Sequence, residues 1–238
     1  MSEEFIQKFL LSFFENELSA IHINADPIDF DSIILSENDN KEIVINDEEE
    51  NFFQGYKYCV KCGASKIVFI FEDFNEVIKI PFNGEYYHSY RKGNVAGTYY
   101  DGFDNYIEIE NEIYQRSDRY LKEILLNNKF IFNFGNVPVY IQTKIFQTFS
   151  ERLHDKNFKL KDYKDALKQV DKLILKNDNS STVASLPDKR FLADILNYYK
   201  DAKFIIPEID FDDMHNDNYG YLKNGKPVIF DFSEFSDY

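Results

Sequence analysis

Apolar residues recur at helical spacing near the start of the sequence. Within residues 3–18 they return every three or four positions, which is typical of a helix with one apolar face. This stripe consists of Phe5, Phe9, Leu10, Phe13, Phe14 and Leu18. We expect the helix to dock on the body of the protein rather than to insert in a membrane. The strongly acidic residues 36–50 predict a solvated connection.

The pattern then becomes strand-like. Three short runs rich in β-branched and aromatic residues cover positions 56–62, 66–71 and 76–80. Such runs, separated by short polar or glycine-containing segments, predict an antiparallel meander. Residues 82–104 follow and hold four of the nine glycines and five tyrosines. This segment predicts a long loop, and loops of that length are usually functional or mobile.

The second half of the sequence mixes helical and strand patterns. We expect helices at 106–126, 160–176 and 188–202, and strands at 129–134 and 137–146. The sequence ends with two short strand patterns that flank a turn at Asn224-Gly225. Five strands with one inserted helix, followed by further helices, predict an α+β fold.

Composition narrows the classes of function. The chain has 27 Lys and Arg against 42 Asp and Glu, a net charge of −15 at pH 7. This charge disfavours general binding to nucleic acid or to an anionic membrane surface, but a nucleotide site needs only a few local donors. No apolar stretch reaches the ~20 residues of a membrane span, and a signal-peptide pattern is absent. Cys59 and Cys62 lack the further ligands of a zinc site and fit thiols of a cytoplasmic protein.

The candidate chemistry lies in the last 26 residues of the sequence. Asn218 follows Asp213 by five residues, and Asp231 follows Asn218 by 13 residues. Phosphoryl transfer from ATP needs a carboxylate near the attacking hydroxyl and oxygen ligands that hold Mg²⁺ on the phosphates. The protein-kinase template sets its catalytic Asp and metal-binding Asn five residues apart, and a hairpin separates that Asn from a second metal-binding Asp. Residues 219–230, with their Asn-Gly turn, predict such a hairpin.

The segment Asp213-Met-His-Asn-Asp-Asn218 is similar to the D-x-H-x-x-N loop of aminoglycoside and choline kinases. It resembles more closely the loop of small serine/threonine protein kinases encoded by bacteriophages. The resemblance covers about residues 56–238 and implies a two-lobed fold with a five-stranded antiparallel N-lobe sheet and a shortened helical C-lobe. We therefore expect an N-terminal helix and connection at 1–50, an N-lobe at 51–146 and a reduced C-lobe at 147–238. ATP and Mg²⁺ are the implied cofactors, and a protein of the host cytoplasm is the implied substrate.

The resemblance also implies roles for single residues. Asp213 would orient the substrate hydroxyl and accept its proton, while Asn218 and Asp231 would hold Mg²⁺. Val77-Ile-Lys79-Ile80 matches the V-A-I-K pattern, so Lys79 would bind the α- and β-phosphates. Its partner would be a glutamate of the next helix. The candidates are Glu108, Glu110 and Glu112; we favour Glu112, with Glu108 as the runner-up.

The phosphate-binding loop departs from the kinase pattern. Gly63-Ala64-Ser65 holds one glycine where typical kinases have G-x-G-x-x-G, although its small residues still allow backbone N–H groups to approach a phosphate. Phe211-Asp212 replaces the usual His-Arg before the catalytic Asp, and only seven residues follow Asp231. The phage kinases are similarly curtailed. We expect His215 to tie the loop by hydrogen bonds.

Two alternative functions stay open. His215 favours an aminoglycoside-type phosphotransferase that acts on a small molecule. The single glycine of the loop and the short C-lobe favour a non-catalytic kinase-like module that binds and inhibits a host protein. Mg²⁺-dependent ATP binding separates the module from the two enzymes, and the choice of phosphate acceptor separates the enzymes from each other.

Overall fold

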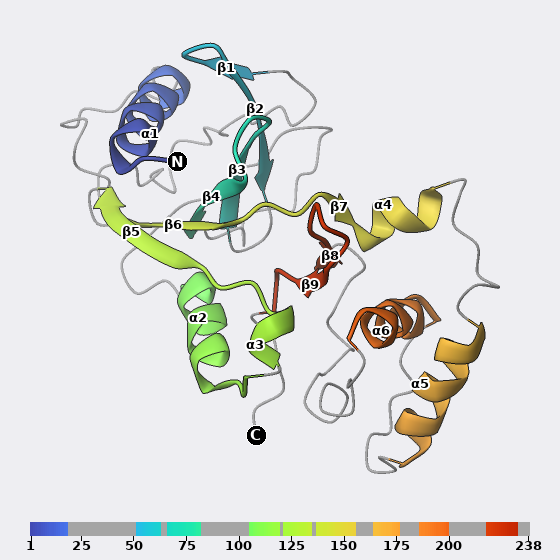
Figure 1. The fold of residues 1–238 in the computed structure, drawn as a ribbon. Helices are drawn as coiled ribbons and strands as arrows, with labels where there is room; N and C mark the ends of the chain where they lie inside the picture. The colour runs from blue at the N-terminus through green and yellow to red at the C-terminus, as the bar shows by residue number, and fades with distance from the viewer. Residues whose placement is uncertain are drawn as a thin grey trace, which may run out of the picture. The chain divides into compact units, whose positions relative to one another are not determined.

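The protein has a mixed α+β fold in a computed structural model, shown in Figure 1. The structure describes residues 1–18, 51–62, 66–81, 105–119, 121–134, 137–155, 164–176, 186–199 and 218–232. Contacts group the chain into two compact units. Unit 1 comprises Met1–Ile109 and Asn128–Lys144, and unit 2 comprises Glu110–Asn127 and Ile145–Tyr238. None of the helices in the described ranges has the length and apolar character needed to cross a bilayer.

Unit 1 is built on a six-stranded antiparallel sheet with the order β1-β2-β3-β4-β6-β5. Its strands are β1 Asn51–Phe53, β2 Tyr56–Cys62, β3 Lys66–Phe71, β4 Glu76–Pro81, β5 Lys129–Phe134 and β6 Val137–Thr143. The predicted meander is confirmed as β2, β3 and β4, whereas β1 is a sixth strand that the sequence pattern did not reveal. The turn from β1 to β2 uses positive φ angles at Gln54 (50°) and Gly55 (85°), as expected for a tight hairpin.

The order of the sheet makes β4 an interior strand. The chain leaves β4, forms helix α2 (Tyr106–Arg116) and helix α3 (Leu121–Ile124), and returns as edge strand β5. The next strand, β6, then pairs with both β4 and β5. As a result, Lys79 of β4 lies between Val68 of β3 and Tyr140 of β6 in the ladder.

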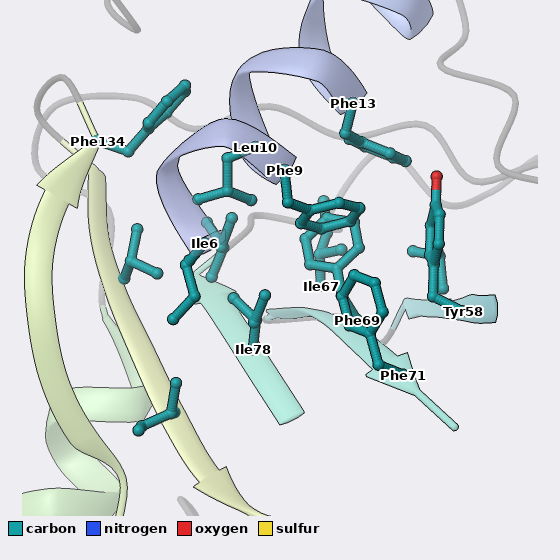
Figure 2. Packing of buried hydrophobic residues seen from close by; sticks show 14 of the residues in the cluster. Ile6, Phe9, Leu10, Phe13, Tyr58, Ile67, Phe69, Phe71, Ile78 and Phe134 are labelled. Carbon is teal, nitrogen blue, oxygen red and sulfur yellow. The ribbon is translucent and has the colours of Figure 1, made fainter. Parts of the chain in front are cut away.

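Helix α1 (Glu3–Leu18) covers one face of this sheet, as Figure 2 shows. Ser2 begins the helix by accepting a hydrogen bond from the backbone N–H of Phe5 at 3.2 Å, and acidic residues occupy the first turn. Alternate strand residues meet its apolar stripe. The main members of this cluster are Ile6, Phe9, Leu10, Phe13, Ile67, Phe69, Phe71, Ile78, Ile80, Val139 and Ile141. The expectation that the first helix docks on the body of the protein is confirmed.

Unit 2 combines helices with a small three-stranded sheet of order β7-β8-β9. Its further elements are β7 Gln147–Thr148, α4 Phe149–His154, α5 Lys164–Lys176, α6 Leu186–Tyr198, β8 Tyr219–Tyr221 and β9 Pro227–Ile229. Tyr219 is fully buried at the centre of the unit and stacks on Phe191 of α6 with ring centroids 4.3 Å apart. The predicted final hairpin is confirmed as β8 and β9.

The single helix predicted over 106–126 is wrong, because the structure divides this segment into α2 and α3. The Ser117 hydroxyl donates a hydrogen bond back to the carbonyl oxygen of Ile113 at 2.8 Å, which closes the end of α2. The Asp118 carboxylate then accepts from the backbone N–H of Leu121 at 2.8 Å and begins α3. Short polar side chains that bind the backbone in this way compete with a continuous helix.

Candidate functional site

The open end of the β8–β9 hairpin brings together two of the predicted site residues. Tyr219 pairs with Ile229 in the ladder, so Asn218 and Phe230 are the next positions outward. The carbonyl oxygen of Asn218 accepts hydrogen bonds from the N–H groups of Phe230 at 3.0 Å and of Asp231 at 3.3 Å. Asn218 and Asp231 are therefore adjacent, and both are half-buried.

The other end of the hairpin fixes this register. Gly225 has a φ angle of 81°, which favours glycine, and its N–H donates to the carbonyl oxygen of Leu222 at 2.8 Å. The Asn224 side chain accepts from the N–H of Lys226 at 3.1 Å. The turn predicted at Asn224-Gly225 is confirmed. Because a slip of one residue would turn every side chain to the opposite face, this turn determines which residues end the hairpin.

Contacts with β7 and α6 hold strand β8 of the hairpin in place. A Cβ atom at Gly220 would overlap the carbonyl oxygen of Gln147, so β7 and β8 approach each other closely at this glycine. On β8, the hydroxyl of Tyr221 donates to the buried carboxylate of Asp194 in α6. The guanidinium of Arg152 lies 4.2 Å from the Tyr221 ring and 3.7 Å from the Asp194 carboxylate. Buried polar contacts of this kind favour one register and one orientation.

The residues at the end of the hairpin have the chemistry that Mg²⁺ requires. Asn218 offers an amide oxygen and Asp231 a carboxylate, and hard cations prefer oxygen ligands. Within the ranges that the structure describes, no three or more His, Cys, Asp or Glu side chains gather around a common point. Two protein ligands are nevertheless enough for Mg²⁺ in a nucleotide site, because phosphate oxygens and water complete its coordination. Asn218 and Asp231 supply two oxygen ligands of this kind.

Unit 1 carries the predicted lysine on the face of its sheet that α1 does not cover. Ile78 and Ile80 belong to the cluster under α1, so Lys79 between them points to the opposite face. Lys79 is only 2% exposed. Burying an ammonium group is costly unless hydrogen bonds or an opposite charge compensate it. Strand position and burial thus agree with the predicted phosphate-binding role, which stays a prediction.

A hydrogen-bond chain links the residue opposite Lys79 to the start of α2. Tyr140 pairs with Lys79 in the ladder, and its hydroxyl donates to the Glu108 carboxylate at 2.9 Å. The same hydroxyl accepts from the Asn105 side chain at 3.1 Å. The Asn105 side chain also caps α2 by accepting from the N–H groups of Ile107 and Glu108, at 3.1 and 3.3 Å. Neither Asn105 nor Tyr140 was predicted, because only the folded sheet brings them together.

The three candidate glutamates of α2 occupy different environments. Glu112, which the sequence favoured, is 66% exposed and pairs with Arg116 at 3.0 Å, one helical turn away. These contacts do not support it as the partner of Lys79. The runner-up, Glu108, accepts a hydrogen bond from Tyr140, which is the cross-strand neighbour of Lys79. Glu110 is fully buried in α2.

The remaining predicted site residues lie outside the described residues. They are Gly63, Ala64 and Ser65 of the phosphate loop, and Asp213 and His215 of the catalytic segment. Comparisons with known proteins add no assignment: no protein-family model matches the sequence, and no curated protein matches it closely.

Proposed function

We propose that this protein is an ATP- and Mg²⁺-dependent protein kinase of the bacteriophage type, which transfers the γ-phosphoryl group to Ser or Thr hydroxyls of a host protein. The observation that carries the proposal is the adjacency of Asn218 and Asp231 at the end of the β8–β9 hairpin. In the kinase template, an Asn and an Asp separated by a hairpin supply the oxygen ligands of the metal. The sequence predicted this hairpin and its turn at Asn224-Gly225.

Each predicted residue has one role in this proposal. Asn218 and Asp231 bind Mg²⁺, which when bound neutralises charge on the phosphates and fixes their orientation. Lys79 binds the α- and β-phosphates through its ammonium group. Asp213 orients the substrate hydroxyl and accepts its proton as the oxygen attacks the γ-phosphorus; the bond between that phosphorus and the β,γ-bridging oxygen breaks, and ADP leaves.

Two observations in unit 1 support the role of Lys79. Its almost complete burial strengthens its attraction to an anion, because the protein interior screens charge less than water does. Its cross-strand neighbour Tyr140 is fixed by hydrogen bonds to Asn105 and Glu108. We therefore propose that Glu108, and not Glu112, helps to position Lys79, and that it acts through its hydrogen bond with Tyr140.

The experiment that tests the proposal is transfer of labelled phosphate from ATP. The wild-type protein should label Ser and Thr residues of host proteins in the presence of Mg²⁺. Asp213→Ala should abolish labelling without a change in thermal unfolding, because the substitution removes the carboxylate that orients the hydroxyl. Unchanged phosphate incorporation by the variant would refute the assignment of Asp213.

The same reaction distinguishes the alternatives. Transfer to an aminoglycoside or another small acceptor, with none to protein, would identify a small-molecule phosphotransferase. Mg²⁺-dependent ATP binding without transfer to any acceptor would remove the catalytic part of the proposal and leave the metal–nucleotide site. Absence of ATP binding would contradict the proposal entirely and would favour a kinase-like binding module.

A further inference from the structure

A second buried lysine lies on the same face of the unit 1 sheet as Lys79. Lys66 begins β3 and is 4% exposed, against 2% for Lys79. Val68 pairs with Lys79 across the β3–β4 ladder, and Lys66 precedes Val68 by two residues on the same strand. Since side chains alternate along a strand, all three point away from α1.

The ladder also fixes how far apart the two lysines lie. Lys66 is the diagonal neighbour of Lys79, and such neighbours are about 7–8 Å apart in an antiparallel pair. Lysine side chains are long and flexible enough for both ammonium groups to reach one anion from these positions. Two further polar side chains, Tyr140 and the buried Gln142 of β6, point to the same face.

Two like charges buried this close on one sheet face repel each other. Both lysines already interact with other groups of the protein. A sheet that needed only packing at these positions would use apolar residues, as its opposite face does throughout the α1 cluster. A ligand with several negative charges would bind both ammonium groups at once.

We propose that Lys66 is a second phosphate-binding residue, which together with Lys79 binds the polyphosphate chain of a nucleoside triphosphate. This inference rests on the proposed function and adds Lys66 to its phosphate-binding residues in unit 1. The sequence just before Lys66 has a single glycine, Gly63, where typical kinases have three. The ammonium group of Lys66 adds a positive charge for the phosphates.

The proposal predicts how affinity depends on the ligand. Lys66 interacts with the phosphates and not with the nucleoside, so its removal should weaken Mg²⁺·ATP binding and leave adenosine binding unchanged. Loss of one hydrogen bond to a charged group corresponds to about tenfold or more in affinity.

The test is a calorimetric titration of the full chain with Mg²⁺·ATP and with adenosine. Lys66→Met should weaken Mg²⁺·ATP binding by about tenfold or more. Lys129→Met is the matched control: it removes the same charge from the exposed end of β5, where the ladder partner is Ile141 of the α1 face. It should bind Mg²⁺·ATP as the wild type does. Equal Mg²⁺·ATP affinities for Lys66→Met and the wild type would overturn the inference but keep the proposed function.

A second measurement uses the wild-type protein and so does not depend on the folding of a variant. Lysine acetylation by a small reagent is quantified at each position by mass spectrometry, with and without saturating Mg²⁺·ATP. The nucleotide should slow the acetylation of Lys66 and Lys79 and leave that of Lys129 unchanged. Unchanged acetylation of Lys66 with protection of Lys79 would overturn the role of Lys66 alone. A wild-type protein that binds no nucleotide would overturn both this inference and the proposed function.

Discussion

The two faces of the unit 1 sheet use the same strands for different purposes. Under α1, alternate residues of β3, β4 and β6 are aliphatic or aromatic and pack into one apolar cluster. On the opposite face, the residues between them include buried Lys66, Lys79, Tyr140 and Gln142. Buried charges contribute little net stability compared with apolar residues of the same size. The first face therefore contributes most to the stability of unit 1, whereas the second face carries the buried polar groups for which we propose a binding role.

The largest expected effect concerns the α1 face. Phe9 is almost fully buried, and its ring contacts those of Phe53, Tyr58, Phe69 and Phe71 at centroid distances of 4.9–5.4 Å. Phe9→Ala should lower the free energy of unfolding by about 3–5 kcal/mol, because it leaves a cavity under the helix. Urea denaturation followed by circular dichroism measures this loss.

A matched control is Phe52→Ala, which removes the same side chain from β1, where it is 65% exposed. Substitutions at such surface positions usually change stability by no more than about 0.5 kcal/mol. Similar losses for the two variants would show that α1 does not form the core of unit 1.

A smaller effect is expected on the second face. Tyr140→Phe keeps the ring but removes the hydroxyl that binds both Glu108 and Asn105. The expected loss is about 0.5–1.5 kcal/mol in the free energy of unfolding, the usual net value of a hydrogen bond. The same denaturation experiment measures this loss of stability. If Tyr140 positions the groups of this face as proposed, Tyr140→Phe should also bind Mg²⁺·ATP more weakly than the wild type.

Glu112→Ala is the control for Tyr140→Phe, since it breaks the exposed ion pair with Arg116. Exposed pairs one helical turn apart contribute about 0.3–0.5 kcal/mol, so stability should hardly change, and affinity for Mg²⁺·ATP should stay at the wild-type value. Weaker nucleotide binding by Glu112→Ala than by Tyr140→Phe would restore Glu112 as the partner of Lys79. A loss of stability for Tyr140→Phe as large as that for Phe9→Ala would erase the difference between the two faces.

The sequence predicted the features that depend on local chemistry. The Asn224-Gly225 turn and the apolar residues beside it determine the β8–β9 register, and that register makes Asn218 and Asp231 neighbours. The helical stripe of residues 3–18 likewise predicts the face of α1 that packs on the sheet. In both cases, a short segment contains all the information required.

Features that depend on distant contacts could not be predicted in this way. Successive helix positions differ by about 100° in direction, so the choice among Glu108, Glu110 and Glu112 requires knowing which side of α2 is covered. The role of Lys66 depends on its ladder position relative to Lys79, and not on its own neighbours in the sequence. Strand β1 has only three residues, too few for a periodic pattern to be evident.

Mg²⁺-dependent ATP binding tests most directly the proposal that Asn218 and Asp231 bind Mg²⁺ together with the phosphates of ATP. The matched variants are Asp231→Asn, which removes the charge of the proposed ligand, and Asp165→Asn, which makes the same change at a 90% exposed position of α5. Each protein is titrated with ATP in a calorimeter, with and without Mg²⁺. The wild type and Asp165→Asn should bind ATP tightly only when Mg²⁺ is present. Asp231→Asn should lose this dependence on Mg²⁺. Binding that is equally dependent on Mg²⁺ in Asp231→Asn would contradict the account.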